Sequence, residues 1–226
     1  FLVRKFYPDL GGVENHVFEV SKRLVSMGHT VTVVCEQEIA SPLRSLAMTK
    51  DKIKIFRIPV GKNEERKKFI VWQWLRKNQQ LIEDADVVHC HDVFYWYLPF
   101  RFLFPNKPVY TTFHGYEGYP IKKRAILVRK ISEKLSWGNI CIGDFIKKWY
   151  GTEPTFVSYG GVNISKFPPS SRLRRTSKIV FIGRLEKDIG IHTYLQALKT
   201  LKKKNIKFSF DAYGDGRLRK QVEKYG

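Results

Sequence analysis

The sequence contains few cysteines and no cysteine motif. Only three are present, Cys35, Cys90 and Cys141, and no pair has the CxxC spacing of a zinc or redox site. Each lies in or beside an apolar run, so we expect buried free thiols in a reducing compartment. A framework of disulfides is therefore not what holds this fold together.

Long apolar runs are also missing. The most apolar window, residues 87–104, is interrupted by polar residues and a proline, so no transmembrane helix is predicted. No signal peptide is visible. The chain begins inside an expected strand, so we expect a few residues before Phe1 and leave open whether a leader preceded them. The polar residues and the proline that interrupt the apolar window 87–104 are His89, His91, Asp92, Pro99 and Arg101.

Acidic residues are scarce relative to basic ones. There are 21 Asp and Glu against 41 Lys and Arg, which gives a formal net charge of +20. This balance indicates anionic partners: phosphorylated ligands, an acidic membrane surface or nucleic acid. Nucleic acid is the weakest of the three, because the basic residues are dispersed and no RNP, KH or helix-turn-helix signature is present.

Strand and helix patterns alternate along the chain and predict an α/β fold. Over residues 1–160 the alternation indicates a doubly wound parallel sheet. Residues 161–177, rich in Gly, Pro, Ser and Arg, are predicted to be a linker. The alternation restarts over residues 178–226, but two strands are too few for a complete domain. We therefore expect a fragment of a longer protein.

The stretch 179–190 carries a candidate anion site. A buried strand, 179–182, is followed by Gly183, Arg184 and a helix from Ile191. Open α/β sheets bind anions in this way at the carboxyl end of a strand. The alternative is an arginine on an ordinary loop. In the second half, Asp215 between Gly214 and Gly216 is either a turn residue or part of a nucleotide pocket.

The Gly11-Gly12 pair joins the first strand to the first helix. Glycines there let a ligand approach the N–H groups at a helix N-terminus, although a simple turn is the alternative. Tyr7, Asp9 and Glu14 flank the pair and could hydrogen-bond sugar hydroxyls. Equally, Glu14 could stabilise the positive end of the helix.

Three histidines are candidate ligand-binding residues. His89 and His91 lie on the same side of a strand, but no third and fourth metal ligand is evident, so we predict no metal site. His114 follows a strand and precedes Gly115, which places it at the carboxyl edge of the sheet. A core or capping histidine is the alternative. No catalytic triad, zinc motif or Walker loop is present.

The segment 122–135 is predicted to be a basic amphipathic helix. Its apolar face is expected to contain Ala125, Val128, Ile131 and Leu135, with the basic residues largely elsewhere. Either these cations bind anionic lipid, or the helix has a core-facing side and a solvated basic back. The cations are Lys122, Lys123, Arg129, Lys130 and Lys134.

Six blocks in order resemble one family. They are 6–14 (FYPDLGGVE), 87–92 (VVHCHD), 111–115 (TTFHG), 158–163 (SYGGVN), 182–185 (IGRL) and 213–216 (YGDG). Together they resemble the retaining GT-B glycosyltransferases called GT4, or glycosyl transferases group 1. The resemblance implies two Rossmann-like domains. The N-terminal one binds an acceptor, the C-terminal one binds a nucleotide-sugar donor, and no metal or other cofactor is required.

The resemblance also implies site residues. Gly11 and Gly12 match the glycine loop that meets the donor diphosphate, and His114 matches the histidine that contacts the transferred sugar. Arg184 matches the arginine that holds the diphosphate, and Gly214 and Gly216 match a turn near the donor nucleotide. We assign acceptor binding to Tyr7, Asp9 and His91.

The sequence departs from the family pattern in two ways. The family's lysine, five positions after the arginine, is replaced by Ile189, so Lys187 is the candidate second cation. The family's Glu-x7-Glu motif would lie beyond Gly226, so the isolated fragment is expected to have doubtful activity.

The sequence thus predicts a hexosyltransferase-type enzyme in the cytoplasm. The basic helix favours a lipid-linked acceptor and peripheral association with the cytosolic face of a membrane. The alternatives are a non-catalytic module that binds phosphate ligands or nucleic acid, and a GT-B sugar epimerase.

Overall fold

The computed structural model describes residues 1–8, 11–37, 47–61, 63–115, 120–167 and 177–225. They divide into two compact units, Phe1–Val162 and Asn163–Gly226, and each is described by itself. Part of the predicted linker, 168–176, lies outside the described residues.

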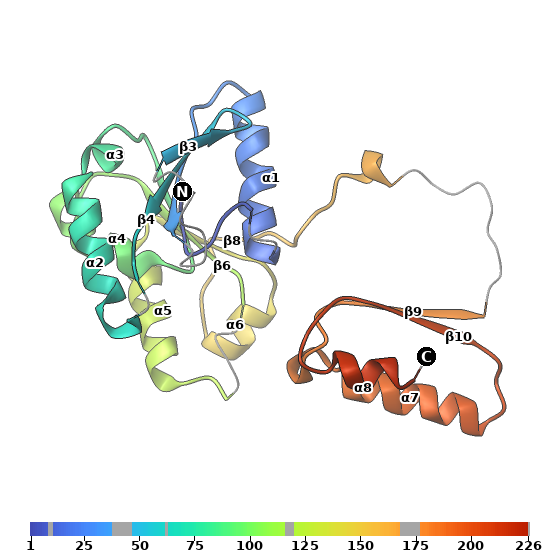
Figure 1. The fold of residues 1–226 in the computed structure, drawn as a ribbon. Helices are drawn as coiled ribbons and strands as arrows, with labels where there is room; N and C mark the ends of the chain where they lie inside the picture. The colour runs from blue at the N-terminus through green and yellow to red at the C-terminus, as the bar shows by residue number, and fades with distance from the viewer. Residues whose placement is uncertain (9–10, 38–46, 62, 116–119, 168–176, 226) are drawn as a thin grey trace. The chain divides into compact units, whose positions relative to one another are not determined.

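The first unit is built on an eight-stranded sheet in the order β3-β4-β2-β1-β5-β6-β7-β8 (Figure 1). Within the described part of the chain, all neighbouring strands pair in parallel except β3, which is antiparallel to β4. The predicted α/β architecture is confirmed. The strands are β1 (Leu2–Val3), β2 (Thr32–Glu36), β3 (Ala47–Lys50), β4 (Ile53–Ile58), β5 (Val88–His91), β6 (Val109–Phe113), β7 (Gly138–Cys141) and β8 (Phe156–Val157).

Helices cover both faces of this sheet. Alternation along β2 sends Val33 to one face, where α1 packs, and Val34 to the other, where α2 and α4 pack. Residues of α5 and α6 form a further core with Phe113 and Cys141. The helices are α1 (Gly12–Ser26), α2 (Glu64–Lys77), α3 (Gln80–Glu83), α4 (Phe94–Leu103), α5 (Lys123–Leu135) and α6 (Phe145–Tyr150).

Two expectations for the region before β5 are wrong. The charged run 62–68 is typical of a loop, and its sequence favours a helix only over 69–82, but α2 already begins at Glu64 and ends at Lys77. Glu, Arg and Lys are good helix formers, so the charged segment extends the helix instead of preceding it. A short separate helix, α3, then completes the connection.

The edge strand β3 was not predicted. Its sequence, Ala47-Met-Thr-Lys50, has little of the β-branched and aromatic character that marks a strand. Antiparallel pairing with β4 stabilises this segment as a strand, although its own residues do not favour one.

The second unit contains a parallel strand pair, β9 (Lys178–Ile182) and β10 (Ser209–Tyr213), with helices α7 (Ile191–Lys203) and α8 (Arg219–Glu223). Two 3-10 turns, η1 (Ile164–Lys166) and η2 (Lys187–Ile189), complete it. Phe181, Leu195 and Leu198 form its core. The opposite face of the pair is open, since Ile182 is 80% exposed.

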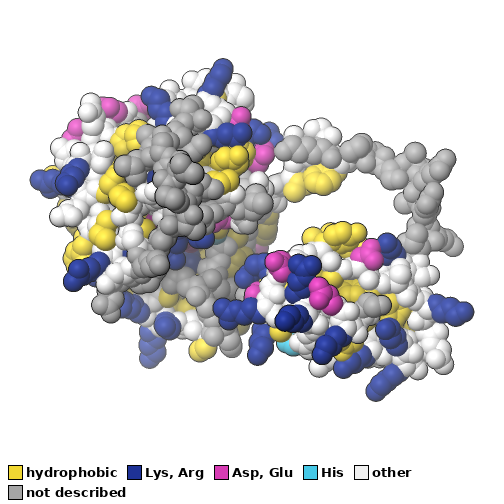
Figure 2. Space-filling view, in the orientation of Figure 1, with side chains coloured by type: hydrophobic (Ala, Val, Ile, Leu, Met, Phe, Trp, Pro, Cys, Tyr) yellow, Lys and Arg dark blue, Asp and Glu magenta, His cyan; other side chains and the backbone are white. Residues whose placement is uncertain are grey.

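Cys35, Cys90 and Cys141 are free and buried, as predicted. Among the helices that the structure describes, none has the length and apolar character needed to cross a membrane. Lys and Arg side chains are spread over the visible surface of both units and not gathered into one patch (Figure 2).

Candidate active site

The carboxyl ends of β5 and β6 bring two of the predicted site residues together. β5 ends at His91, which pairs in register with Thr112 of β6, and His114 follows β6 directly. The Nδ1 atom of His91 lies 2.9 Å from Nε2 of His114. The prediction that His114 lies at the carboxyl edge of the sheet is confirmed, and ligands of open α/β sheets bind at this edge.

The site also lies at the topological switch point of the sheet. β1 pairs with β2 on one side and with β5 on the other, so the chain turns in opposite directions after β1 and after β5. The loop after β1 leads through Gly11 to α1, and β5 ends at His91. The glycine loop and His91 therefore border the crevice where such folds bind ligands.

His16 completes the cluster and was missed from the sequence. Its ring centroid lies 5.2 Å from that of His114 and 6.0 Å from that of His91. One nitrogen from each of the three rings lies within 4.8 Å of the others. Its place in the chain could have indicated it. His16 lies one turn inside α1, and the N-terminus of α1 must lie at the carboxyl edge of the sheet because the helix follows β1.

His89 supports this cluster from the strand. Its ring stacks on His91 at 4.5 Å between centroids, which confirms that both side chains lie on the same side of β5. Its Nε2 atom lies 2.7 Å from the Thr112 hydroxyl oxygen. The Nε2 atom of His91 is buried and has no hydrogen-bond partner among the described residues.

Burial keeps these imidazoles neutral. It lowers the pKa of His89 to about 3 and that of His114 to about 4, with a smaller contribution from neighbouring positive groups. The pKa of His91 is lowered well below its ordinary value, again mainly by burial. At neutral pH the cluster thus presents hydrogen-bonding nitrogens without charge, which suits sugar hydroxyls.

A buried arginine of α5 holds the loop that carries His114. The Arg129 guanidinium lies 4.1 Å from the Tyr150 ring centroid and donates to the Gly115 carbonyl at 2.5 Å. It also lies 3.6 Å from the Asp92 carboxylate, which accepts the His114 backbone N–H at 3.1 Å. Arg129 thus fixes the chain on both sides of His114.

The predicted faces of α5 are wrong in part, although Leu135 packs against the core as expected. Arg129 and Ser132 point inward, whereas Val128 and Ile131, expected in the core, are exposed. An arginine can occupy the inner face here because aromatic rings, a carbonyl and a carboxylate surround its head group.

The glycine loop lies at the start of α1. Gly11 is the residue before the helix, and Gly12 is its first residue. A Cβ at Gly11 would lie 2.1 Å from a Glu14 carboxylate oxygen, so Glu14 folds back over the positive end of the helix. The Tyr7 ring stacks on Phe18 at 5.6 Å between centroids. Asp9 lies outside the described residues.

In the second unit, the predicted order of strand, glycine, basic residue and helix is present. β9 ends at Ile182 and α7 begins at Ile191, and both Arg184 and Lys187 are exposed in the connection. Arg184 thus lies on the βα loop that leads into α7, and anion binding by this loop stays a prediction.

Gly214 and Gly216 have a structural role. A Cβ at Gly214 would lie 1.9 Å from the Gly183 carbonyl oxygen, and one at Gly216 would lie 2.5 Å from that of Leu185. The Leu185 N–H donates to the Asp215 carbonyl at 2.8 Å. Only glycine lets the loops after β9 and β10 pack this closely.

Among the residues that the structure describes, one group could hold a metal: His16, His91 and His114. This group differs from the pair considered from the sequence, because it contains His16 and His114 but not His89. The neighbouring Asp92 carboxylate is paired with Arg129, so it leaves little negative charge at the cluster to attract a cation. The absence of a required metal remains a prediction.

The buried histidines predict acid destabilisation. Because their folded pKa values lie below the unfolded value of about 6.5, the unfolded chain binds more protons between pH 6.5 and 4. The free energy of unfolding should fall as pH decreases through this window, by up to about 1.4 kcal/mol per pH unit for each of His89 and His114. Urea unfolding followed by tryptophan fluorescence measures the first unit alone, because all five tryptophans lie in it.

A matched pair of variants tests the assignment. His89→Gln should flatten this pH dependence, since glutamine cannot titrate, while His29→Gln at an exposed position should leave it unchanged. An equal slope in wild type and His89→Gln would show that burial of His89 does not contribute.

Comparison with known proteins identifies the family and supports the fold. The family model for Glycosyltransferase Family 4 matches residues 10–166. The lipopolysaccharide outer core galactosyltransferase WaaB is similar with a TM-score of 0.55 and 16% identity, over 99% of this chain and 70% of that one. WaaG, a glycosyltransferase involved in lipopolysaccharide biosynthesis, has a TM-score of 0.53 and 13% identity, over 99% and 65% of the two chains.

A UDP-N-acetylglucosamine 2-epimerase from Rickettsia bellii is also similar, with a TM-score of 0.54 and 12% identity over 98% of this chain. The chain spans 63% of that epimerase's length. No curated protein matches the sequence.

The sheet, its switch-point site and the second strand–helix unit define a GT-B-like, Rossmann-type α/β protein. The family match covers more than half of the chain and includes the glycine loop, the histidine cluster and Arg129. The chain belongs to Glycosyltransferase Family 4.

Proposed function

We propose that this chain is the acceptor-side domain and the first part of the donor-side domain of a retaining glycosyltransferase. The observation that carries the proposal is the neutral cluster of His16, His91 and His114 beside the glycine start of α1. Uncharged nitrogens at a switch point suit a sugar, and free N–H groups at a helix start suit its phosphates.

The proposed roles follow the reaction. The anomeric C–O bond to phosphate breaks with its electron pair on the phosphate oxygen. The acceptor oxygen bonds to the anomeric carbon on the same face, and its proton passes to the departing phosphate oxygen. Arg184, with Lys187, stabilises the leaving diphosphate, while Gly11 and Gly12 offer it backbone N–H groups. Gly214 and Gly216 lie near the nucleotide, His114 contacts the transferred sugar, and Tyr7, Asp9 and His91 bind the acceptor.

We further propose a cytoplasmic enzyme with domains 1–160 and 178–226 joined by linker 161–177. A lipid-linked acceptor is supported by the net charge of +20 and by the likeness to WaaB and WaaG, which act in lipopolysaccharide synthesis.

The direct test is transfer from a panel of nucleotide sugars by the complete enzyme that carries these residues. We expect transfer from one donor, with the anomeric configuration of that donor retained in the product, as read by proton NMR. Inversion would contradict the proposed mechanism. Conversion of the donor sugar into its epimer without any transfer would instead favour the epimerase alternative. The likeness to the Rickettsia bellii epimerase is the reason to test for it.

Chelation tests the proposal that no metal is needed. Because a guanidinium supplies the positive charge at the leaving group, EDTA should leave the rate of transfer unchanged. Loss of activity in EDTA, restored by adding Zn²⁺, would assign a metal to the histidine cluster. A His16→Gln variant would then identify the site, since it removes one of the three nitrogens.

A further inference from the structure

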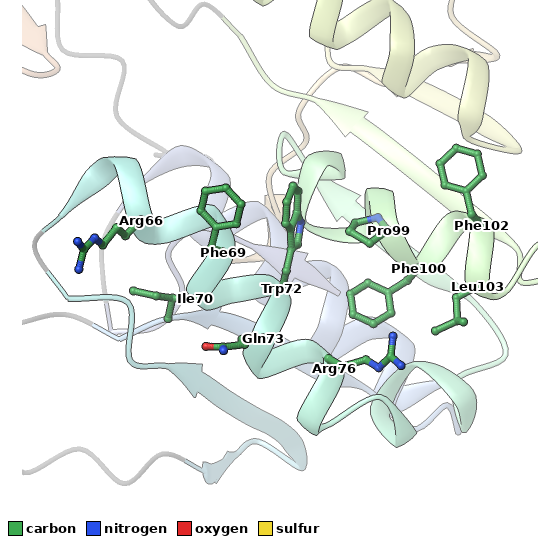
Figure 3. A pocket seen from close by; sticks show the side chains of 10 residues that line it. All are labelled: Arg66, Phe69, Ile70, Trp72, Gln73, Arg76, Pro99, Phe100, Phe102 and Leu103. Carbon is green, nitrogen blue, oxygen red and sulfur yellow. The ribbon is translucent and has the colours of Figure 1, made fainter.

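A groove of 880 Å³ runs between α2 and α4 on the face of the first unit away from α1 (Figure 3). Its walls are mainly aromatic and aliphatic, and arginines of α2 stand along it. The apolar lining is Phe69, Ile70, Trp72, Phe100, Phe102 and Leu103, and the arginines are Arg66 and Arg76.

Pro99 and Trp72 fix the two helices that form the groove. Pro99 lies inside α4 and has no N–H, so the Tyr95 carbonyl one turn earlier loses its helical donor. The Trp72 indole N–H donates to that carbonyl at 2.8 Å and ties α2 to α4. Phe69 packs edge-on against Trp72, with ring centroids 5.6 Å apart. The aromatic lining is therefore ordered before any ligand enters.

Several large apolar side chains that line the groove are exposed to solvent. Phe69 is 57% exposed and Phe102 is 71% exposed, and Leu103 is exposed next to Phe102. Exposed single apolar residues are normal, but several of them along one groove mark a binding surface.

Cations flank this apolar surface. Arg66 and Arg76 are both exposed and ten residues apart on α2, about 15 Å along the helix. The Lys68 ammonium lies 4.9 Å from the Phe69 ring centroid, so its charge stands directly beside an apolar side chain. Apolar rings bordered by Lys and Arg are the pattern of a helix that lies in the headgroup region of a bilayer.

We propose that this groove docks the protein on an anionic membrane. Phe69 and Phe102 enter the acyl region, and Arg66 and Arg76 bind lipid phosphates. Charge complementarity favours a bilayer over an apolar protein partner, because the chain carries +20 and the groove is flanked by guanidinium groups.

We extend the proposed membrane surface to helix α5, which lies next to α4. It packs beside α4, where Arg101 donates to the Leu135 carbonyl at 2.8 Å. Leu127 and Ile131 of α5 are exposed together with Lys123. The membrane contact predicted for this helix thus becomes part of a larger surface, and Arg129 has no part in it because it is buried.

Sedimentation of the protein with vesicles tests the proposal. The vesicles contain phosphatidylglycerol and phosphatidylcholine in equal amounts, with phosphatidylcholine alone as the neutral comparison. Phe69→Ser combined with Phe102→Ser should weaken partitioning to the anionic vesicles by about tenfold or more. Met27→Ser with Phe156→Ser removes equally exposed apolar side chains elsewhere on the unit and should have no effect.

A second pair tests the charge. Arg66→Gln combined with Arg76→Gln should reduce partitioning by about fivefold for each arginine. Lys202→Gln with Lys203→Gln, exposed on α7, should change it far less. All these positions are exposed, and an unchanged unfolding curve will confirm that the variants fold.

Three results would overturn the proposal. One is equal binding to neutral vesicles. Another is full binding by the Phe69→Ser, Phe102→Ser variant. The third is self-association without vesicles that this variant abolishes, since a second copy of the chain would then be the occupant. Nucleotide-sugar binding should be unaltered in every variant, so a failure here leaves the proposed transfer reaction untouched.

Discussion

Replacing Arg184 by alanine is expected to lower kcat for sugar transfer by about 10³-fold in the complete enzyme. Cleavage of the donor develops negative charge on a phosphate oxygen, and a fixed guanidinium stabilises that charge more in the transition state than in the bound donor. Arg184 is exposed on the loop between β9 and α7, where we propose that the donor diphosphate binds. Single-turnover kinetics with saturating donor measures the effect on the chemical step.

Three further variants sharpen this test. Arg217→Ala removes another exposed arginine of the same unit and should change kcat little. Lys187→Ala should cost about tenfold, since an exposed lysine contributes a point charge without a bidentate contact. Arg184→Lys should restore only part of the rate. If Arg184→Ala raises KM for the donor and leaves kcat intact, the arginine binds donor and transition state equally and has no catalytic role.

The fold could be predicted from the sequence because buried parallel strands are short apolar runs that helices separate. Apolar residues such as Ile53, Ile55 and Ile58 favour the strand β4, and the spacing of Val17, Val20 and Leu24 favours the helix α1. These elements follow from local periodicity. The strand β3 does not, since its residues favour no strand and its structure comes from pairing with β4.

The site was predictable only where topology alone determines position. His91 and His114 end neighbouring parallel strands, so their meeting follows from the sheet order. His16 required knowing which face of α1 turns toward the crevice, and the sequence did not show it. Arg129 was misplaced for a different reason: a helical pattern assigns arginine to solvent, and only distant partners such as Tyr150 and Asp92 reverse that preference.

Arg129→Met is expected to lower the free energy of unfolding of the first unit by about 3 kcal/mol. Methionine can fill much of the space between Phe113 and Tyr150, but it cannot donate to the Gly115 carbonyl or pair with Asp92. The loss of these contacts leaves a carbonyl and a carboxylate without their cation. Urea unfolding followed by tryptophan fluorescence isolates the effect, because all five tryptophans lie in this unit.

Arg124→Met on the same helix is the matched control. Arg124 is exposed, so this variant should change stability by less than about 0.5 kcal/mol. Arg129→Lys keeps the charge but loses the planar fork, and should fall between the two. Because Asp92 accepts the His114 N–H, Arg129→Met should also reduce transfer at temperatures where the protein stays folded. Equal stability of the two methionine variants would mean that Arg129 does not hold the His114 loop, and that the aromatic packing around it is sufficient.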